Sequence, residues 1–173
     1  MTDAQLLNDR ERPALRFERR LHDPPDVVWQ ALTEREQLRS WFPCDVIVSG
    51  GRWEVGAAIT FPVRPEVIDL TLTGEVLEVD EPNVLAFTWG DDRLRFELSP
   101  EGEGTRLVLV DELPPDSAAR NAAGWEQCLD RLAGAEPAVD GWQPLFERYA
   151  AAFEPTLGPQ QARPAQEGVS GKR

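Results

Sequence analysis

Hydrophobic and polar positions recur with two different periods along this chain, and each period predicts one kind of element. In residues 14–21, Leu15, Phe17 and Leu21 alternate with charged neighbours, with Arg19 as one basic position on the apolar face. This period of two predicts a half-buried strand. The same period returns after residue 43 in six runs, separated by short turns rich in Gly, Asp, Asn and Pro. The turns predict an antiparallel meander, with strands at 44–48, 57–63, 69–79, 83–89, 93–99 and 105–113.

Helical spacing appears in two other parts of the chain. Pro24, Pro25 and Asp26 mark the start of a short helix over 25–33. Thr33 and Glu36 match a capping box, which predicts a second short helix over 34–41.

A long helix is expected over 117–135, followed by a linker at 134–141 and a second helical piece over 142–155. Gly124, beside Trp125, is expected to let the long helix approach a strand closely. The apolar stripe of the long helix consists of Ala118, Ala122, Trp125, Cys128, Leu129 and Leu132.

This order of elements predicts an α+β fold of the helix-grip type. We expect a curved antiparallel sheet of about seven strands wrapped around the long C-terminal helix, with two short helices after the first strand. Such an arrangement tends to leave space between sheet and helix. The domain is expected over 14–154, between two mobile tails at 1–13 and 155–173 that are polar or rich in Pro, Gly and Gln.

The composition narrows the classes of partner. At 173 residues the chain fits a single domain, and its formal net charge of −13 disfavours nucleic acids and anionic membranes. No apolar run is long enough for a membrane span, and the first residues lack a signal peptide's basic start and apolar middle. We therefore expect a cytoplasmic protein.

Catalytic and metal-binding patterns are absent from the sequence. The one histidine, His22, lies in a turn between Leu21 and two prolines, where a surface or capping role is expected. Cys44 and Cys128 have no CxxC partner and are expected to be small buried hydrophobic residues. No nucleophile elbow, nucleotide-binding loop or metal-ligand spacing occurs. The sequence predicts no enzyme, cofactor or metal.

Carboxylates are the remaining candidates for acid–base chemistry. Glu97 or Asp111 would reach the concave face of the sheet if the strand register slipped by one residue. With 31 acidic residues in the chain, solvated surface positions are the default interpretation for both.

Aromatic residues from several predicted elements can point into the interior. They are interpreted either as plain core or as the wall of an apolar cavity, with Thr71, Thr73, Thr88 or Gln127 as polar handles. The predicted lining consists of Trp41, Phe42, Ile59, Phe61, Leu72, Phe87, Trp89, Phe96, Leu98, Leu109, Trp125 and Leu129.

Several segments in this order resemble a known superfamily. They are VWQALTEREQLRSWF at 28–42, Gly50, Gly51 and Trp53, GEVLEVDEPNVLAFTW at 74–89, GTRLVLV at 104–110 and AAGWEQCLDRL at 122–132. Residues 14–153 resemble the SRPBCC group of START-like (Bet v-like) domains, in the bacterial branch similar to the C-terminal domain of the activator of heat-shock-protein-90 ATPase. The resemblance implies a helix-grip fold and, in many members, a pocket for a lipid, polyketide or other apolar ligand.

The resemblance leaves three functions open. The first is a noncatalytic protein that binds a small hydrophobic molecule between the sheet and the C-terminal helix. The second is a co-chaperone-like interaction module whose acidic surface meets a basic partner, because the net charge is −13 and the eukaryotic namesake binds a chaperone. The third is a cyclase- or aromatase-like enzyme, which requires a buried titratable group in the pocket. The chain is expected to be a monomer or a weak homodimer.

Overall fold

One antiparallel sheet forms the frame of the molecule. The computed structural model describes residues 4–63, 70–137 and 141–162. Within these ranges eight strands pair in the order β1-β2-β8-β7-β6-β5-β4-β3, so that β3 to β8 form the predicted meander. The strands are β1 (Gln5–Leu7), β2 (Ala14–Leu21), β3 (Ile47–Val48), β4 (Ala58–Val63), β5 (Leu70–Asp80), β6 (Val84–Trp89), β7 (Asp92–Glu101) and β8 (Gly104–Glu112).

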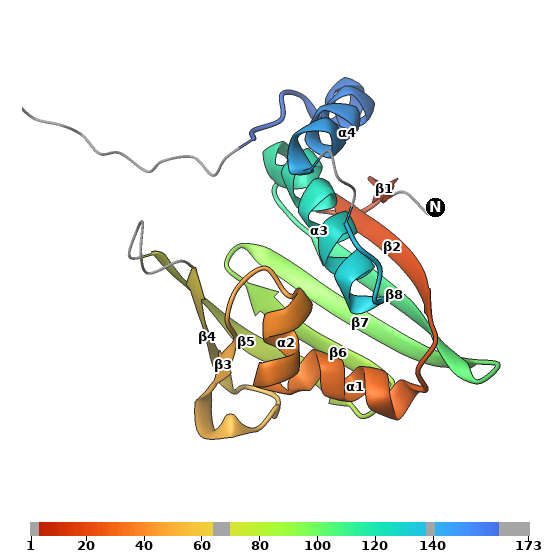
Figure 1. Cartoon of the computed structure of the whole chain (residues 1–173). Helices are drawn as coiled ribbons and strands as arrows, with labels where there is room; N and C mark the ends of the chain where they lie inside the picture. Colours follow the sequence, from red (N-terminus) through yellow and green to blue (C-terminus); the bar gives the residue numbers. More distant parts are fainter. Residues whose placement is uncertain (1–3, 64–69, 138–140, 163–173) are drawn as a thin grey trace, which may run out of the picture.

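The helices that form the core with the sheet lie on one of its faces (Figure 1). They are α1 (Pro25–Thr33), α2 (Arg35–Trp41) and α3 (Ala118–Leu132), and α4 (Trp142–Leu157) packs against α3. The curved sheet, the two short helices after β2 and the long helix after β8 confirm the predicted helix-grip fold.

The start of α2 differs from the prediction. Thr33 is the last residue of α1, and its hydroxyl donates a hydrogen bond to the carbonyl oxygen of Trp29 at 2.8 Å. Glu34 occupies the N-cap position of α2 without a side-chain cap bond, and Glu36 pairs with Arg39. The predicted capping box is therefore wrong, because the threonine hydroxyl bonds backward within the first helix.

Both predicted tails contain ordered residues. β1 lies in the first 13 residues and pairs with β2, and the backbone N–H of Ala4 donates to the Tyr149 hydroxyl oxygen at 3.1 Å. After α4, the Gln160 side chain accepts from the Ala119 N–H at 2.9 Å and donates to the Pro115 carbonyl oxygen at 2.9 Å. Residues 163–173 lie outside the described part of the chain.

Close backbone approach occurs at a glycine other than the predicted one. A Cβ atom at Gly74 of β5 would collide with the backbone carbonyl of Thr88 in β6. A Cβ atom at Gly124 of α3 would meet open space. The expectation that Gly124 brings α3 close to a strand is therefore wrong; the tight contact lies between two strands.

Candidate functional site

Aromatic rings from helices and strands meet between the sheet and α3. Neighbouring ring centroids lie between 5.5 and 6.5 Å apart, a spacing typical of packed aromatic pairs. Phe42, directly after α2, links the group because its ring contacts those of Phe61, Trp89 and Trp125. We name these residues the aromatic cluster: Trp41, Phe42, Phe61, Phe87, Trp89, Phe96 and Trp125.

All twelve residues predicted to line a cavity belong to or pack against one hydrophobic core. Its aliphatic members among the twelve are Ile59, Leu72, Leu98, Leu109 and Leu129. Ten of the twelve are buried, whereas Leu72 and Trp89 are half-buried. The alternation along the strands thus identified the inward face correctly. That these residues line a ligand cavity stays a prediction.

The predicted threonine handles do not point into this core. Thr71 and Thr73 are exposed, because the inward position between them belongs to Leu72. The Thr88 hydroxyl lies at the Glu75 backbone, where it accepts the amide hydrogen bond at 2.8 Å. These three interpretations are wrong for one reason: each threonine is out of phase with the apolar side of its strand. Gln127 is half-buried on α3.

The aromatic cluster contains a buried indole nitrogen as a polar group, in place of the predicted threonine hydroxyls. Among the described residues, the buried Trp89 Nε1 atom has no hydrogen-bond partner within normal distance and angle limits. The Cys44 thiol lies beside this indole. Burial raises the pKa of Cys44 to about 12, and the contact with Trp89 acts in the opposite direction. The half-buried end of the cluster therefore combines aromatic surface, a donor and an un-ionised thiol.

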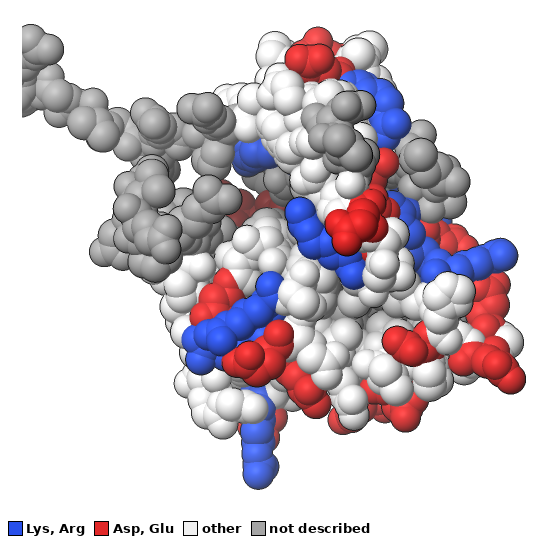
Figure 2. All heavy atoms as spheres, viewed as in Figure 1, with Lys and Arg blue, Asp and Glu red and all other residues white. Residues whose placement is uncertain are grey.

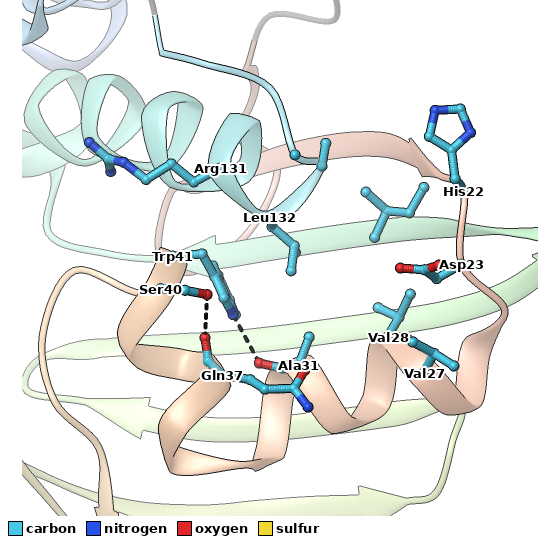
Figure 3. A pocket seen from close by; sticks show the side chains of 13 residues that line it. His22, Asp23, Val27, Val28, Ala31, Gln37, Ser40, Trp41, Arg131 and Leu132 are labelled. Carbon is cyan, nitrogen blue, oxygen red and sulfur yellow. Dashed lines mark hydrogen bonds between the residues drawn. The ribbon is translucent and has the colours of Figure 1, made fainter.

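A hollow of about 300 Å³ lies at a different place, between the end of α3 and the helices α1 and α2. In Figure 3, Leu132 and Val28 face this hollow from opposite sides, whereas the His22 imidazole and the Arg131 guanidinium lie away from them. Trp41 is the member of the predicted lining that borders it, and its indole N–H donates to the Ala31 carbonyl oxygen at 2.9 Å. The hollow is thus distinct from the predicted cavity.

Two aspartates lie among the inward-facing residues of the sheet. Asp92 begins β7 and is 7% exposed, and Asp111 in β8 is 0% exposed. The Asn121 side chain of α3 donates to Asp92 Oδ2 at 2.7 Å and, with a longer contact of 3.4 Å, to Asp111 Oδ2. The Trp125 indole N–H donates to Asp111 Oδ2 at 2.8 Å. We name Asp92 and Asp111 the carboxyl pair.

The surroundings of the carboxyl pair favour a protonated carboxyl group. Among the residues that the structure describes, no N–H or O–H group donates to the buried Asp111 Oδ1, and the two carboxyl groups contact each other. Two carboxyl oxygens form a hydrogen bond only if one group is protonated. Burial raises the pKa of Asp111 well above its usual range, and the charge of Asp92 raises it further. Burial also raises the pKa of Asp92, to about 6.

Sequence reasoning found one member of this pair and missed the other. Asp111 is inward in phase with Leu107 and Leu109, so the register slip that was expected to be necessary does not occur. Glu97 is exposed and bonds to Arg95 at 2.8 Å. Asp92 was overlooked, although the alternation of β7 at positions 92, 94, 96 and 98 marks it as inward.

A second buried carboxyl site lies between α3 and α4. Glu126 is 6% exposed. The Tyr149 hydroxyl donates to its Oε2 at 2.6 Å, and the Arg148 guanidinium donates to the same oxygen at 2.9 Å. Burial raises the pKa of Tyr149 to about 12, and the hydrogen bond to Glu126 adds to this. This contact joins the two helices.

The remaining predicted candidates show no reactive arrangement. His22 is exposed, which confirms a surface position. Both cysteines are free; Cys128 is buried as expected, whereas Cys44 is half-buried. Over the described ranges, His, Cys, Asp and Glu side chains form no group of three or more that could hold a metal ion. No helix in the described part of the chain is long and apolar enough to cross a membrane.

Solved structures share this fold. A conserved protein of unknown function from Enterococcus faecalis has a TM-score of 0.75 and 23% sequence identity, over 88% of this chain and 91% of that chain. CalU16 from Micromonospora echinospora has a TM-score of 0.66 and 20% identity, over 91% and 96%. A protein from Bordetella parapertussis has a TM-score of 0.63 and 24% identity, over 90% and 92%. At these identities the likeness establishes the fold alone.

A comparison with curated proteins gave no match. A family described as "Activator of Hsp90 ATPase homolog 1-like protein" matches residues 22–135, which span α1 to the end of α3. This match confirms the resemblance seen in the sequence and supports a ligand-binding or co-chaperone-like domain in general. The chain belongs to the activator of Hsp90 ATPase homolog 1-like family.

Proposed function

We propose that this chain is a noncatalytic binding protein that holds a small hydrophobic molecule between the sheet and α3. The observation that carries the proposal is the aromatic cluster, which brings rings from α2, α3 and three strands together. Ligand sites are lined mainly by apolar and aromatic side chains with few polar groups. The cluster has this composition, with the indole N–H of Trp89 as a donor for a ligand oxygen.

The half-buried end of the cluster is the proposed entrance. Leu72 and Trp89 are the partly exposed members of the predicted lining, and Cys44 lies beside Trp89. Because the rings pack closely, a ligand has to displace at least one of them. Phe42 is the natural candidate, since it lies between α2 and β3 and its movement breaks no strand pairing.

Binding to a neutral, fluorescent apolar dye tests this proposal, with two half-buried tryptophans as a matched pair. Trp89 belongs to the cluster, whereas Trp142 stacks on Phe146 in α4. We expect saturable binding by the wild type, a change of at least about tenfold in Kd for Trp89→Ala and little change for Trp142→Ala. Native mass spectrometry of the purified protein would identify a ligand that copurifies. Absence of saturable binding, or equal effects of the two substitutions, would contradict the proposal.

The carboxyl pair supports a second candidate, a cyclase-like enzyme. Such an enzyme requires a buried titratable group near the ligand, and the Trp125 indole contacts both Asp111 and the rings of Phe42 and Trp89. A protonated buried carboxyl group could donate to a ligand carbonyl oxygen. Chemical conversion of a copurified ligand, followed by mass spectrometry, would favour this candidate; unchanged recovery of the ligand favours simple binding.

The co-chaperone alternative calls for a gathered acidic surface that meets a basic partner. On the face seen in Figure 2, acidic and basic side chains are interspersed. Arg35 and Arg39, for example, both pair with Asp45. This mixture gives the alternative less support than the aromatic cluster gives to ligand binding.

A further inference from the structure

Two polar side chains one helical turn apart attach α3 to the sheet. Asn121 and Trp125 lie on the same side of the helix, and both donate to the carboxyl pair. The same Trp125 ring packs in the aromatic cluster against Phe96. The position of α3 over the cluster is therefore coupled to the state of the two aspartates.

The charged groups around the pair do not supply a cation in contact with it. Arg12 donates a hydrogen bond to the backbone oxygen of Asp91 at 2.7 Å. Its charge lowers the pKa of Asp92 without a contact between the two side chains. Arg120, at the start of α3, is half-buried and likewise acts on Asp92 through its field. Among the described residues, no ion pair within 4.0 Å joins an arginine or lysine to either carboxyl group.

The neighbouring acidic groups oppose ionisation of the pair. Asp91, next to Asp92 in the hairpin, raises the pKa of Asp92 through its charge. The charge of Asp116, ahead of α3, raises the pKa of Arg120. Glu112 follows Asp111 in the chain but bonds to Arg10. With donors from α3 and, among the described residues, no cation in contact, the carboxyl pair is more stable with one proton than with none.

We propose that the proton shared by Asp92 and Asp111 is a switch that sets how firmly α3 closes over the aromatic cluster. With the proton present, the pair accepts from Asn121 and Trp125 and α3 is held against the sheet. When the last proton leaves, two negative charges meet in a buried site, and α3 loosens so that water can reach them. The consequence for ligand access rests on the proposed binding function; the response of α3 does not.

The sign of the effect follows from linkage. Both carboxyl groups bind protons more tightly in the folded protein than in the unfolded chain, where the pKa of aspartate is about 3.9. The folded state then binds more protons at pH values between the unfolded and the folded pKa, so its stability falls as pH rises over this interval and levels off above the folded pKa values. α3 is therefore tightest under mildly acidic conditions and loosens as the solution becomes alkaline.

Asp111→Asn imitates the protonated pair at every pH. The new amide can donate to Asp92 while its oxygen accepts from Trp125, so the variant should keep α3 closed. Asp92→Asn provides the same test from the less buried side. Glu75→Gln is the matched control, because it removes an exposed carboxylate from β5.

Nuclear magnetic resonance of the full chain tests the switch. Between about pH 5 and about pH 9 we expect the Trp125 indole N–H signal to titrate, and α3 amides to exchange at least about tenfold faster than the intrinsic pH effect predicts. The exchange of β7 and β8 amides should accelerate less with pH than that of α3 amides. Asp111→Asn and Asp92→Asn should abolish both responses, and Glu75→Gln should keep them. A stationary indole signal, or the same pH response in the asparagine variants, would overturn the proposal.

Dye binding at both ends of this pH range separates the switch from the proposed function. Faster dye association at alkaline pH, lost in Asp111→Asn, supports both. Absence of dye binding at any pH contradicts the binding function and leaves the α3 measurement to decide on the switch. Binding that is independent of pH while α3 responds overturns the claim that α3 controls access.

Discussion

Two buried carboxyl sites lie along α3, and each is stabilised in a different way. Toward α4, Glu126 receives hydrogen bonds from a tyrosine hydroxyl and from Arg148, whose side chain is 47% exposed. Toward the sheet, Asp111 receives one indole hydrogen bond and contacts a second acid. The first site contains a cation that reaches it from the solvent, and the second does not.

The difference shows that the route to solvent determines what neutralises a buried acid. An arginine on α4 can extend its long side chain along the surface and place only its guanidinium on Glu126. Asp111 lies on the inner face of a central strand, between β2 and β7 and beneath α3, where its neighbours Leu15, Leu94 and Trp125 are themselves buried. A proton is the cation small enough to enter such a site.

Removal of Trp125 should have the largest effect, because this residue serves both the core and the carboxyl pair. Trp125→Ala is expected to lower the free energy of unfolding by about 3–5 kcal/mol. Trp125→Phe keeps a ring but removes the donor to Asp111, so a loss of about 1–3 kcal/mol is expected. Urea denaturation checks both. Equal losses would mean that the indole N–H, rather than packing, dominates.

Removal of the cation from the other site should have an intermediate effect. Arg148→Met leaves Glu126 with the Tyr149 hydroxyl as its donor, and a loss of about 1–2 kcal/mol is expected in urea denaturation because the arginine is half exposed. In the double variant with Glu126→Gln, most of this loss should disappear. If the two substitutions were additive, the proposed dependence of the buried carboxylate on its cation would be contradicted.

A half-buried acid after α2, Asp45, sharpens the contrast in pH response and should show the smallest effect. The hydrogen bond from Arg35 lowers the pKa of Asp45 to about 2. Since the unfolded value is about 3.9, this contribution is complete above about pH 4 and is lost as pH falls toward 2. Asp45→Asn should cost below about 1 kcal/mol near neutrality and reduce the loss of stability on acidification. Urea denaturation midpoints of wild type and variant near neutral pH and toward pH 2 check this. If the variant loses as much stability on acidification as the wild type, the prediction is contradicted.

Much of the fold could be predicted from local patterns. Pro24 and Pro25 predicted the start of α1. The alternation of β6 to β8 identified the inward side chains Phe87, Phe96 and Leu109. These signals are local because backbone geometry alone sets which side chains share a face. Two features were not predictable in this way: the pairing of β1 with β2, and the contacts of Gln160 with the start of α3. In each case one of the two joined segments, β1 or the stretch around Gln160, shows no periodic pattern.

The carboxyl pair illustrates what the chain determines and what three dimensions add. The alternation in each strand, taken alone, already directs Asp92 and Asp111 inward with their apolar neighbours, because the side-chain period of a strand is two. That the two carboxyl groups meet depends on the pairing of β7 with β8, and that they meet without a cation depends on how α3 covers them. Sequence therefore set the direction of each side chain. The tertiary structure decided their partners, since a buried charge is governed by the groups that surround it.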